Sequence, residues 1–401
     1  MRAASALRKA ASLALAGSVT LAVVSGPLSA HDGTRVQRVV VGRGSALAAC
    51  DGLDSSNAYR ARSRFPRNAV LSFRGRLAGG IGQAPASDSV GNLIIAHGEP
   101  RLSKLDPKGQ TLWSERLPNE ASCAPVLLGS GAILIVTRDG DALFFSSSGK
   151  LEHKHPLPFS ETSRHTLAIP TGSGGALVAR GSELVQVDAG GRVERRTRAK
   201  TDVSALAESG ANLVAVSVDG GVQIAHESGD FETVGSFGGT VTDGAAVRSG
   251  NVFAIVDAHK WLALDLNNGQ VTTLATDAAL TLTGPAALFA AAGAALVVDG
   301  GFVSTRHGDG SEALRIPLSN FGPGFDPALR GLRPALVISD SDGALAAVRS
   351  GTDALVVGPD GSVVHVEGSS CLDPFRPTPT PNELVFACRS GQLFGVSGKA
   401  P

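Results

Sequence analysis

Residues 91–118 run GNLIIAHGEPRLSKLDPKGQTLWSERLP and contain the pattern that decides the fold. Three short runs, LIIAH, RLSKLD and TLWSERL, are separated by a Gly-Glu-Pro turn and an Asp-Pro-Lys-Gly turn. Short apolar or alternating runs bounded by glycine and proline favour extended backbone and tight reversals. The stretch therefore predicts three consecutive β-strands, and the same pattern recurs along the chain.

The recurrence has a regular period. The glycines that close the turn after each third strand are separated by 40, 42, 38, 40, 41, 51 and 37 residues, and they are Gly109, Gly149, Gly191, Gly229, Gly269, Gly310, Gly361 and Gly398. A period of about 40 residues with three or four short strands in each unit is typical of propeller blades. Helical repeats are disfavoured because the runs are short and rich in β-branched residues. We expect an all-β fold, an eight-bladed β-propeller of four-stranded blades.

The two ends of the chain complement each other. The last repeat stops after its third strand, QLFGVSG, and lacks an outer strand. Residues 71–77, LSFRGRL, align with residues 111–117, TLWSERL, and place Phe73 where the first repeat has Trp113. An N-terminal strand that completes the last blade removes exposed sheet edges. We therefore expect a closed propeller over residues 68–399.

Residues 1–30 have the features of a secretory signal peptide. Arg2, Arg8 and Lys9 precede an apolar run at residues 13–24, and small residues lead to a cleavage site after Ala30. Residues 31–67 follow as an irregular N-terminal segment. We expect export to the periplasm or cell envelope, or secretion, and no membrane-spanning segment in the mature chain, because no later apolar run reaches about 20 residues.

The four cysteines are Cys50, Cys123, Cys371 and Cys388. An even number of cysteines in an exported chain indicates disulfides. Cys371 precedes the first strand of the last repeat and Cys388 ends its antiparallel second strand, so we predict that these two are bridged and that Cys50 is bridged to Cys123. The alternative is a lipid anchor at Cys50, because residues 47–50, LAAC, resemble a bacterial lipobox; the short and polar segment before it disfavours this.

Residues 84–117, APASDSVGNLIIAHGEPRLSKLDPKGQTLWSERL, resemble the PQQ-like β-propeller repeat, and residues 124–158, 251–274 and 333–366 look like degenerate copies. This family includes quinoprotein dehydrogenases, but the adjacent Cys-Cys pair typical of those enzymes is absent from the sequence. In length, signal sequence and quinone-free blades the chain is similar to the non-enzymatic branch, the propeller lipoproteins of outer-membrane β-barrel assembly.

The sequence gives only weak signals for metal binding, nucleic-acid binding or catalysis. His153 and His155 have the spacing that places two side chains on one face of a strand and so suits a metal ion, yet a solvated loop is favoured. The basic run at residues 192–200 lacks aromatic partners for bases and falls where an outer strand is expected. The formal net charge is zero, which excludes a global electrostatic attraction to nucleic acid. We predict no catalytic, cofactor-binding or metal-binding residues.

The turns between the second and third strands of successive repeats carry charged residues. These are His97 or Arg101, then Arg138, Arg180, Asp219, Asp257, Asp299, Arg349 and Arg389. Around a closed ring they would form a basic arc over the seventh blade to the third and an acidic arc over the fourth to the sixth. We predict that this rim docks a charge-complementary partner; ordinary polar turn chemistry is the alternative.

Taken together, the sequence predicts an exported, non-catalytic β-propeller that acts as a monomeric protein-binding or scaffolding module in the bacterial cell envelope, with another envelope protein as its partner. One alternative is an accessory lipoprotein of outer-membrane β-barrel assembly. A quinoprotein dehydrogenase and a sensor or carbohydrate-binding propeller are further alternatives. Carbohydrate binding is disfavoured because the chain has a single Tyr and two Trp, and sugar sites commonly use aromatic faces.

Overall fold

The computed structural model describes residues 60–61, 69–160, 165–226, 230–241, 244–276, 282–288, 293–298, 302–317, 337–338, 344–345, 348–350, 353–357, 363–366, 375, 378–381 and 383–398. All of them belong to one unit, Val39–Pro401. The predicted signal peptide and most of the irregular segment at residues 31–67 lie outside the described residues.

The described residues form β-strands and turns without any helix, and they contain seven four-stranded sheets of antiparallel strands. The first three sheets are β3 (Ala86–Ser87), β4 (Leu93–Ala96), β5 (Arg101–Leu105) and β6 (Thr111–Arg116); β7 (Val126–Leu127), β8 (Ile133–Val136), β9 (Asp141–Phe145) and β10 (Leu151–Pro156); and β11 (Thr166–Pro170), β12 (Ala176–Arg180), β13 (Glu183–Val187) and β14 (Val193–Arg198). The next three are β15 (Val203–Ser209), β16 (Asn212–Ser217), β17 (Gly221–Ala225) and β18 (Glu232–Ser236); β19 (Ala245–Arg248), β20 (Asn251–Val256), β21 (Lys260–Asp265) and β22 (Val271–Thr276); and β23 (Leu282–Leu288), β24 (Ala294–Val298), β25 (Phe302–Arg306) and β26 (Glu312–Pro317).

The seventh four-stranded sheet joins strands that are far apart in the sequence. Its order is β2 (Ala69–Arg76), β34 (Gln392–Gly398), β33 (Glu383–Ala387) and β32 (Thr378–Pro379), and β2 pairs with β34 in antiparallel fashion. Two smaller sheets complete the described strands: β1 (Arg60–Ala61), β27 (Val337–Ile338) and β28 (Ala344–Leu345), and β29 (Val348–Ser350), β30 (Asp353–Val357) and β31 (Val363–Val366).

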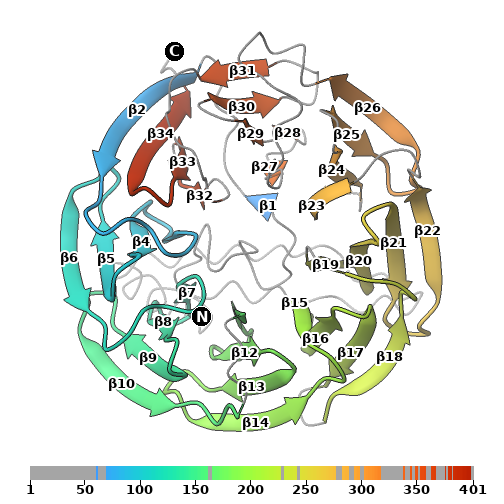
Figure 1. The fold of residues 1–401 in the computed structure, drawn as a ribbon, viewed down its shortest axis with the longest axis horizontal. Coiled ribbons are helices and arrows are strands. Elements are labelled where there is room, and N and C mark those ends of the chain that lie inside the picture. The colour runs from blue at the N-terminus through green and yellow to red at the C-terminus, as the bar shows by residue number, and fades with distance from the viewer. Residues whose placement is uncertain are drawn as a thin grey trace, which may run out of the picture. The chain divides into compact units, whose positions relative to one another are not determined.

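Within this unit, the sheets follow one another around a ring, as in a β-propeller (Figure 1). The first strands of neighbouring sheets contact one another in the order β3, β7, β11, β15, β19 and β23, and β3 also contacts β32. Each four-stranded sheet made of consecutive strands runs outward from its first strand to its fourth. The prediction of an all-β fold built from four-stranded antiparallel sheets is confirmed.

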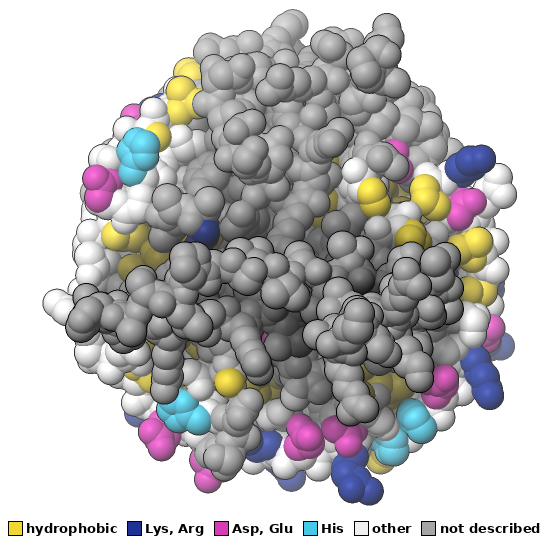
Figure 2. All heavy atoms as spheres, turned by 180° about the vertical axis from the view of Figure 1, so that it is seen from behind, with side chains coloured by type: hydrophobic (Ala, Val, Ile, Leu, Met, Phe, Trp, Pro, Cys, Tyr) yellow, Lys and Arg dark blue, Asp and Glu magenta, His cyan; other side chains and the backbone are white. Residues whose placement is uncertain are grey.

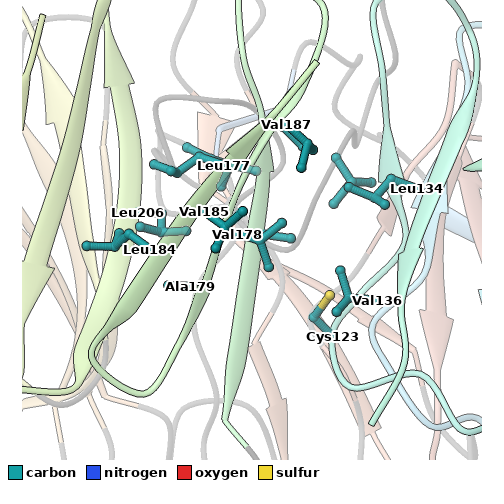
Figure 3. Packing of buried hydrophobic residues seen from close by; sticks show 14 of the residues in the cluster. Cys123, Leu134, Val136, Leu177, Val178, Ala179, Leu184, Val185, Val187 and Leu206 are labelled. Carbon is teal, nitrogen blue, oxygen red and sulfur yellow. The ribbon is translucent and has the colours of Figure 1, made fainter. Parts of the chain in front are cut away.

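The core lies between successive sheets. Strands β4 (LIIA) and β8 (ILIV) are buried along their whole length, because both faces of each sheet are covered by its neighbours. Figure 3 shows this packing between the second and third sheets, where Leu134 and Val136 of β8 approach Val178 of β12 and Val185 of β13. Outer strands such as β6 and β10 are mostly exposed and carry polar side chains.

Among the described residues, neighbouring sheets also meet at several of the turns that precede outer strands. Gly149, between β9 and β10, has a φ of 90°, and the indole of Trp113 from β6 packs directly on its Cα side. The Trp113 Nε1–H donates a hydrogen bond of 3.1 Å to the carbonyl oxygen of Ser147 in the same turn. In the next sheet, Phe144 and His155 pack on Gly191, which has a φ of 86°. Glycine is needed here because an added Cβ would clash with the ring that docks on it.

Candidate binding rim

The turns between second and third strands lie at the same end of their sheets. The strands of each sheet are antiparallel and every sheet begins at its inner strand, so every second strand runs toward the same end. The connections from each outer strand to the next inner strand reach this end too. The charged rim predicted from the sequence is therefore built from these turns and connections.

Arg101 and Arg138 are exposed on this rim, and each has an acidic neighbour. The Arg101 Nε lies 3.0 Å from Glu99 Oε1, and the Arg138 Nη2 lies 2.7 Å from Glu120 Oε2. Exposed ion pairs of this kind contribute at most about 1 kcal/mol to stability. Their effect here is on the surface charge, because each glutamate offsets the arginine beside it.

His97, the alternative to Arg101 at this turn, is only 5% exposed. Its Nε2 lies 2.9 Å from Ser103 Oγ, and its Nδ1 lies 3.2 Å from the carbonyl oxygen of Ala78. Burial lowers the pKa of His97 below its ordinary value of 6.5, and Arg101 also lowers it, while the Ala78 hydrogen bond and Glu99 oppose the shift. His97 is therefore a packed residue next to β2 and offers no surface for a partner.

Arg180 differs from the prediction because it is only 4% exposed. Its Nη2 donates a 2.7 Å hydrogen bond to the carbonyl oxygen of Thr137, its Nε donates to Thr166 Oγ1 at 3.3 Å, and its guanidinium lies 5.2 Å from the ring centroid of Phe159. Burial lowers the pKa of Arg180, and the nearby Cys123 and Asp139 partly oppose this shift. Arg180 thus joins the second and third sheets and is not part of the exposed rim.

The acidic positions are exposed and take part in turn hydrogen bonds. Asp219 accepts a hydrogen bond from the Gly221 N–H at 3.2 Å. Asp257 accepts one from the Thr240 N–H at 2.8 Å, and this bond, followed by Lys260 3.4 Å away, lowers the pKa of the Asp257 carboxyl. Asp219 and Asp257 therefore combine a structural role in the turns with an exposed negative charge.

The last described position, Arg389, is exposed in the turn between β33 and β34, and its guanidinium lies 4.8 Å from the ring centroid of Phe375. Asp299 lies outside the described residues, and of Arg349 only its backbone place in β29 is described. The structure therefore brings Arg101, Arg138 and Arg389 to one exposed end.

Glu99 and Glu120 are the rim residues that sequence reasoning missed. Glu99 lies in the turn between β4 and β5, two residues before Arg101, so its position in the sequence could have indicated this pairing. Glu120 lies in the connection from β6 to β7, and nothing in the sequence pairs it with Arg138. On the face drawn in Figure 2, described side chains of both signs are interspersed.

Two of the four cysteines, Cys123 and Cys388, lie among the described residues, and both are buried. Cys123 is 6% exposed and packs near Val136 between the second and third sheets (Figure 3). Cys388 follows β33, is buried and is disulfide-bonded. Cys50 and Cys371, the predicted partners, lie outside the described residues, so the pairings Cys50–Cys123 and Cys371–Cys388 stay predictions.

No group of three or more His, Cys, Asp or Glu side chains converges as metal ligands among the described residues. None of the described segments forms a helix with the length and apolar character needed to cross a membrane.

Comparison with solved structures shows likeness in fold. BamB from Moraxella catarrhalis has 15% identity and a TM-score of 0.58, over 83% of this chain and 99% of that one. Quinohemoprotein alcohol dehydrogenase from Comamonas testosteroni has 8% identity and a TM-score of 0.63, over 91% of this chain and 82% of that one. Virginiamycin B lyase from Staphylococcus aureus has 10% identity and a TM-score of 0.53, over 82% of this chain and 99% of that one.

At these identities the similarities concern the β-propeller fold alone, and the three proteins named include two enzymes and an assembly factor. No curated protein matches the sequence. A family model described as outer membrane protein assembly factor BamB matches residues 22–316, which is most of the chain. The chain therefore belongs to the BamB-like family of PQQ-like β-propellers.

Proposed function

We propose that this protein is an exported, non-catalytic scaffold that binds another envelope protein during outer-membrane protein assembly. The observation that carries the proposal is the match of residues 22–316 to a family described as an outer membrane protein assembly factor. The inferred signal peptide at residues 1–30 provides export, and the partner is one of the proteins that insert or chaperone outer-membrane proteins. The protein acts as a monomer and holds no cofactor.

The proposed scaffold has eight blades and is closed by β2. Six four-stranded sheets follow in sequence from β3 to β26, the strands β29 to β31 contribute the seventh blade, and β32 to β34 with β2 form the eighth. Two long-range hydrogen bonds support closure. Ser87 Oγ donates to the carbonyl oxygen of Pro379 at 2.6 Å, and Thr378 Oγ1 donates to that of Pro85 at 3.2 Å. A closed ring gives a rigid platform without free inner edges.

We place the partner on the rim formed by the turns between second and third strands. Arg101 and Arg138 are exposed there with their acidic neighbours, and complementary charges on a partner would fix its orientation more than they would add affinity. The rim is also the end at which residues from several sheets are presented together. A partner that contacts two adjacent turns would therefore be held in one orientation.

The test is recovery of partners from the native envelope. The full-length protein with a C-terminal tag is cross-linked in cells, purified and analysed by quantitative mass spectrometry. We expect outer-membrane assembly proteins to be enriched with the wild type and lost with Arg101→Glu/Arg138→Glu. The matched control, Lys108→Glu/Lys150→Glu, changes the net charge equally on turns at the opposite end and should keep them.

The outcomes separate the two parts of the proposal. Equal recovery by the wild type and the arginine double variant would refute the rim while leaving the scaffold function intact. No enrichment of assembly proteins by the wild type would refute the function itself. A quinone-dependent dye reduction by the purified protein would instead establish the dehydrogenase alternative.

The state of Cys50 is tested by the intact mass of the mature protein before and after reduction. A chain that begins at His31 and gains four hydrogens on reduction agrees with export and two disulfides. A chain that begins at a lipid-modified Cys50 would replace the Cys50–Cys123 bridge with a membrane anchor.

A further inference from the structure

His153 and His155 lie on the outer strand of the second sheet, β10, and not in a solvated loop as the sequence suggested. His153 is opposite Phe144 and His155 is opposite Ala142 on β9, and the register shift lies before His153. Successive side chains of a strand point to opposite faces, so both imidazoles share one face while Lys154 points to the other.

The two imidazole rings are already close and nearly parallel. Their centroids are 6.1 Å apart with an interplanar angle of 29°. Two imidazole nitrogens that each bind one metal ion at about 2.1 Å place the ring centroids at most about 6.5 Å apart. The observed spacing falls within that limit. Because the rings are stacked, one of them must turn so that a nitrogen of each ring faces the same ion.

His155 is held in place by its surroundings. Its ring meets Phe144 edge-on, with centroids 6.5 Å apart and an angle of 73°. On the next sheet, Gly191 leaves room for it, since a Cβ there would lie 2.5 Å from His155 Cδ2. His153 is exposed and is therefore able to rotate toward its partner. Because His155 is already held in place, only the side chain of His153 must be ordered when a shared ion binds, and the entropic cost of binding is smaller.

The positively charged side chain of Lys154, which stands between the two histidines in the sequence, points away from them. The Lys154 ammonium lies 2.8 Å from Asp141 Oδ2, and this ion pair holds it on the opposite face of β10. A cation that approached the imidazole face would therefore not meet the lysine directly. Imidazole is a common ligand for Zn²⁺, Cu²⁺ and Ni²⁺, and Cu²⁺ binds most tightly to nitrogen ligands among the divalent first-row ions.

We propose that His153 and His155 form a two-histidine site for a divalent transition-metal ion, with water in the remaining coordination positions. The site is at the outer edge of the second sheet and is independent of the proposed rim. Once one imidazole has bound the ion, the second binds as part of the same molecule, and this gain is on the order of 100-fold in affinity.

The test uses the full chain and Cu²⁺ alone as the probe, with isothermal titration and electron paramagnetic resonance as readouts. We expect a site with nitrogen couplings from two imidazoles, and an affinity about 100-fold lower in His153→Gln. His307→Gln is the matched control, because His307 is also exposed but lies after β25 in another sheet, and it should bind like the wild type.

His155→Gln should give the same loss of affinity as His153→Gln. His155 also packs on Gly191, so its variant is compared only if its thermal unfolding midpoint matches the wild type; the exposed His153 supplies the decisive result otherwise. The proposal would be overturned if the wild-type protein showed no Cu²⁺ site with two imidazole ligands. It would also be overturned if His153→Gln bound Cu²⁺ as tightly as the wild type.

Discussion

The contact between Trp113 and Gly149 predicts a large and separable effect of the substitution Gly149→Ala. The φ of Gly149 is 90°, and an alanine Cβ would lie 2.7 Å from Trp113 Cδ2 and 2.9 Å from Cγ. The left-handed backbone costs an L-residue about 1–2 kcal/mol. Moving the indole costs about 1–3 kcal/mol in displaced packing, and its bond to the Ser147 carbonyl is worth about 1 kcal/mol.

The expected total is a loss of about 3–6 kcal/mol in the free energy of unfolding, obtained by adding these contributions. Gly131→Ala is the matched control. Gly131 has a φ of 83°, yet no heavy atom lies within 4 Å of the position of an added Cβ. It therefore carries the backbone cost without the clash and should lose only about 1–2 kcal/mol.

Urea unfolding of four proteins isolates the clash: Trp113→Ala alone, Gly149→Ala alone, the double variant and the wild type. In the Trp113→Ala background, Gly149→Ala should cost no more than Gly131→Ala, which gives a coupling of about 2–4 kcal/mol between the two sites. If Gly149→Ala costs the same as Gly131→Ala in the wild-type background, the docking of the indole on this turn does not stabilise the fold.

Three further predictions concern buried polar groups. Burial lowers the pKa of His97, so the imidazole binds a proton more readily in the unfolded chain than in the folded one. The contribution of neutral His97 to stability is therefore fully present above pH 6.5 and is lost as the pH falls below it. The thermal unfolding midpoint, measured from pH 7.5 to 5.5, should depend less on pH in His97→Gln than in the wild type. Glu183 is 2% exposed, and its carboxylate accepts hydrogen bonds from the N–H and the Oγ–H of Ser160. Glu183→Ala should lower the free energy of unfolding, measured in urea, by about 2–3 kcal/mol. An unchanged free energy would contradict the idea that Glu183 fixes Ser160 to β13. Trp261 is fully buried, and its Nε1 has no hydrogen-bond partner among the described residues. Trp261→Phe should therefore lower the unfolding free energy by less than about 1.5 kcal/mol and Trp261→Ala by about 3–5 kcal/mol, and a clearly larger loss for Trp261→Phe would show that the indole N–H makes a hydrogen bond.

The strand pattern could be predicted because its determinants are local. Glycine is favoured in these turns by their left-handed backbone, and the period of the glycines predicted the repeat. Five of the eight marker glycines are described with positive φ, namely Gly109, Gly149, Gly191, Gly269 and Gly310. The continuous apolar runs likewise predicted strands covered on both faces, as in β4 and β8.

The character of the rim could be predicted only in part. The sequence placed Arg138 and Arg180 in equivalent turns. Arg138 lies in the turn between β8 and β9, and Arg180 is the last residue of β12, directly before the corresponding turn. Their environments differ because Arg180 meets Phe159 and the Thr137 carbonyl from the preceding sheet, while Arg138 faces solvent beside Glu120. Burial of an equivalent position depends on residues more than 20 positions away, and one repeat examined alone carries no information about them.

The sheet junctions explain why glycine marks the repeats better than tryptophan does. Trp113 docks on Gly149, but Phe144 and His155 together dock on Gly191. At the later junctions a backbone oxygen approaches the glycine instead, that of Val234 at Gly269 and that of Leu274 at Gly310. An aromatic ring, a pair of rings and a carbonyl all fit against a residue without Cβ, so the docking group is free to vary while the glycine is not. The single repeat ending in tryptophan is therefore one solution among several, and loss of that residue elsewhere does not imply loss of the blade.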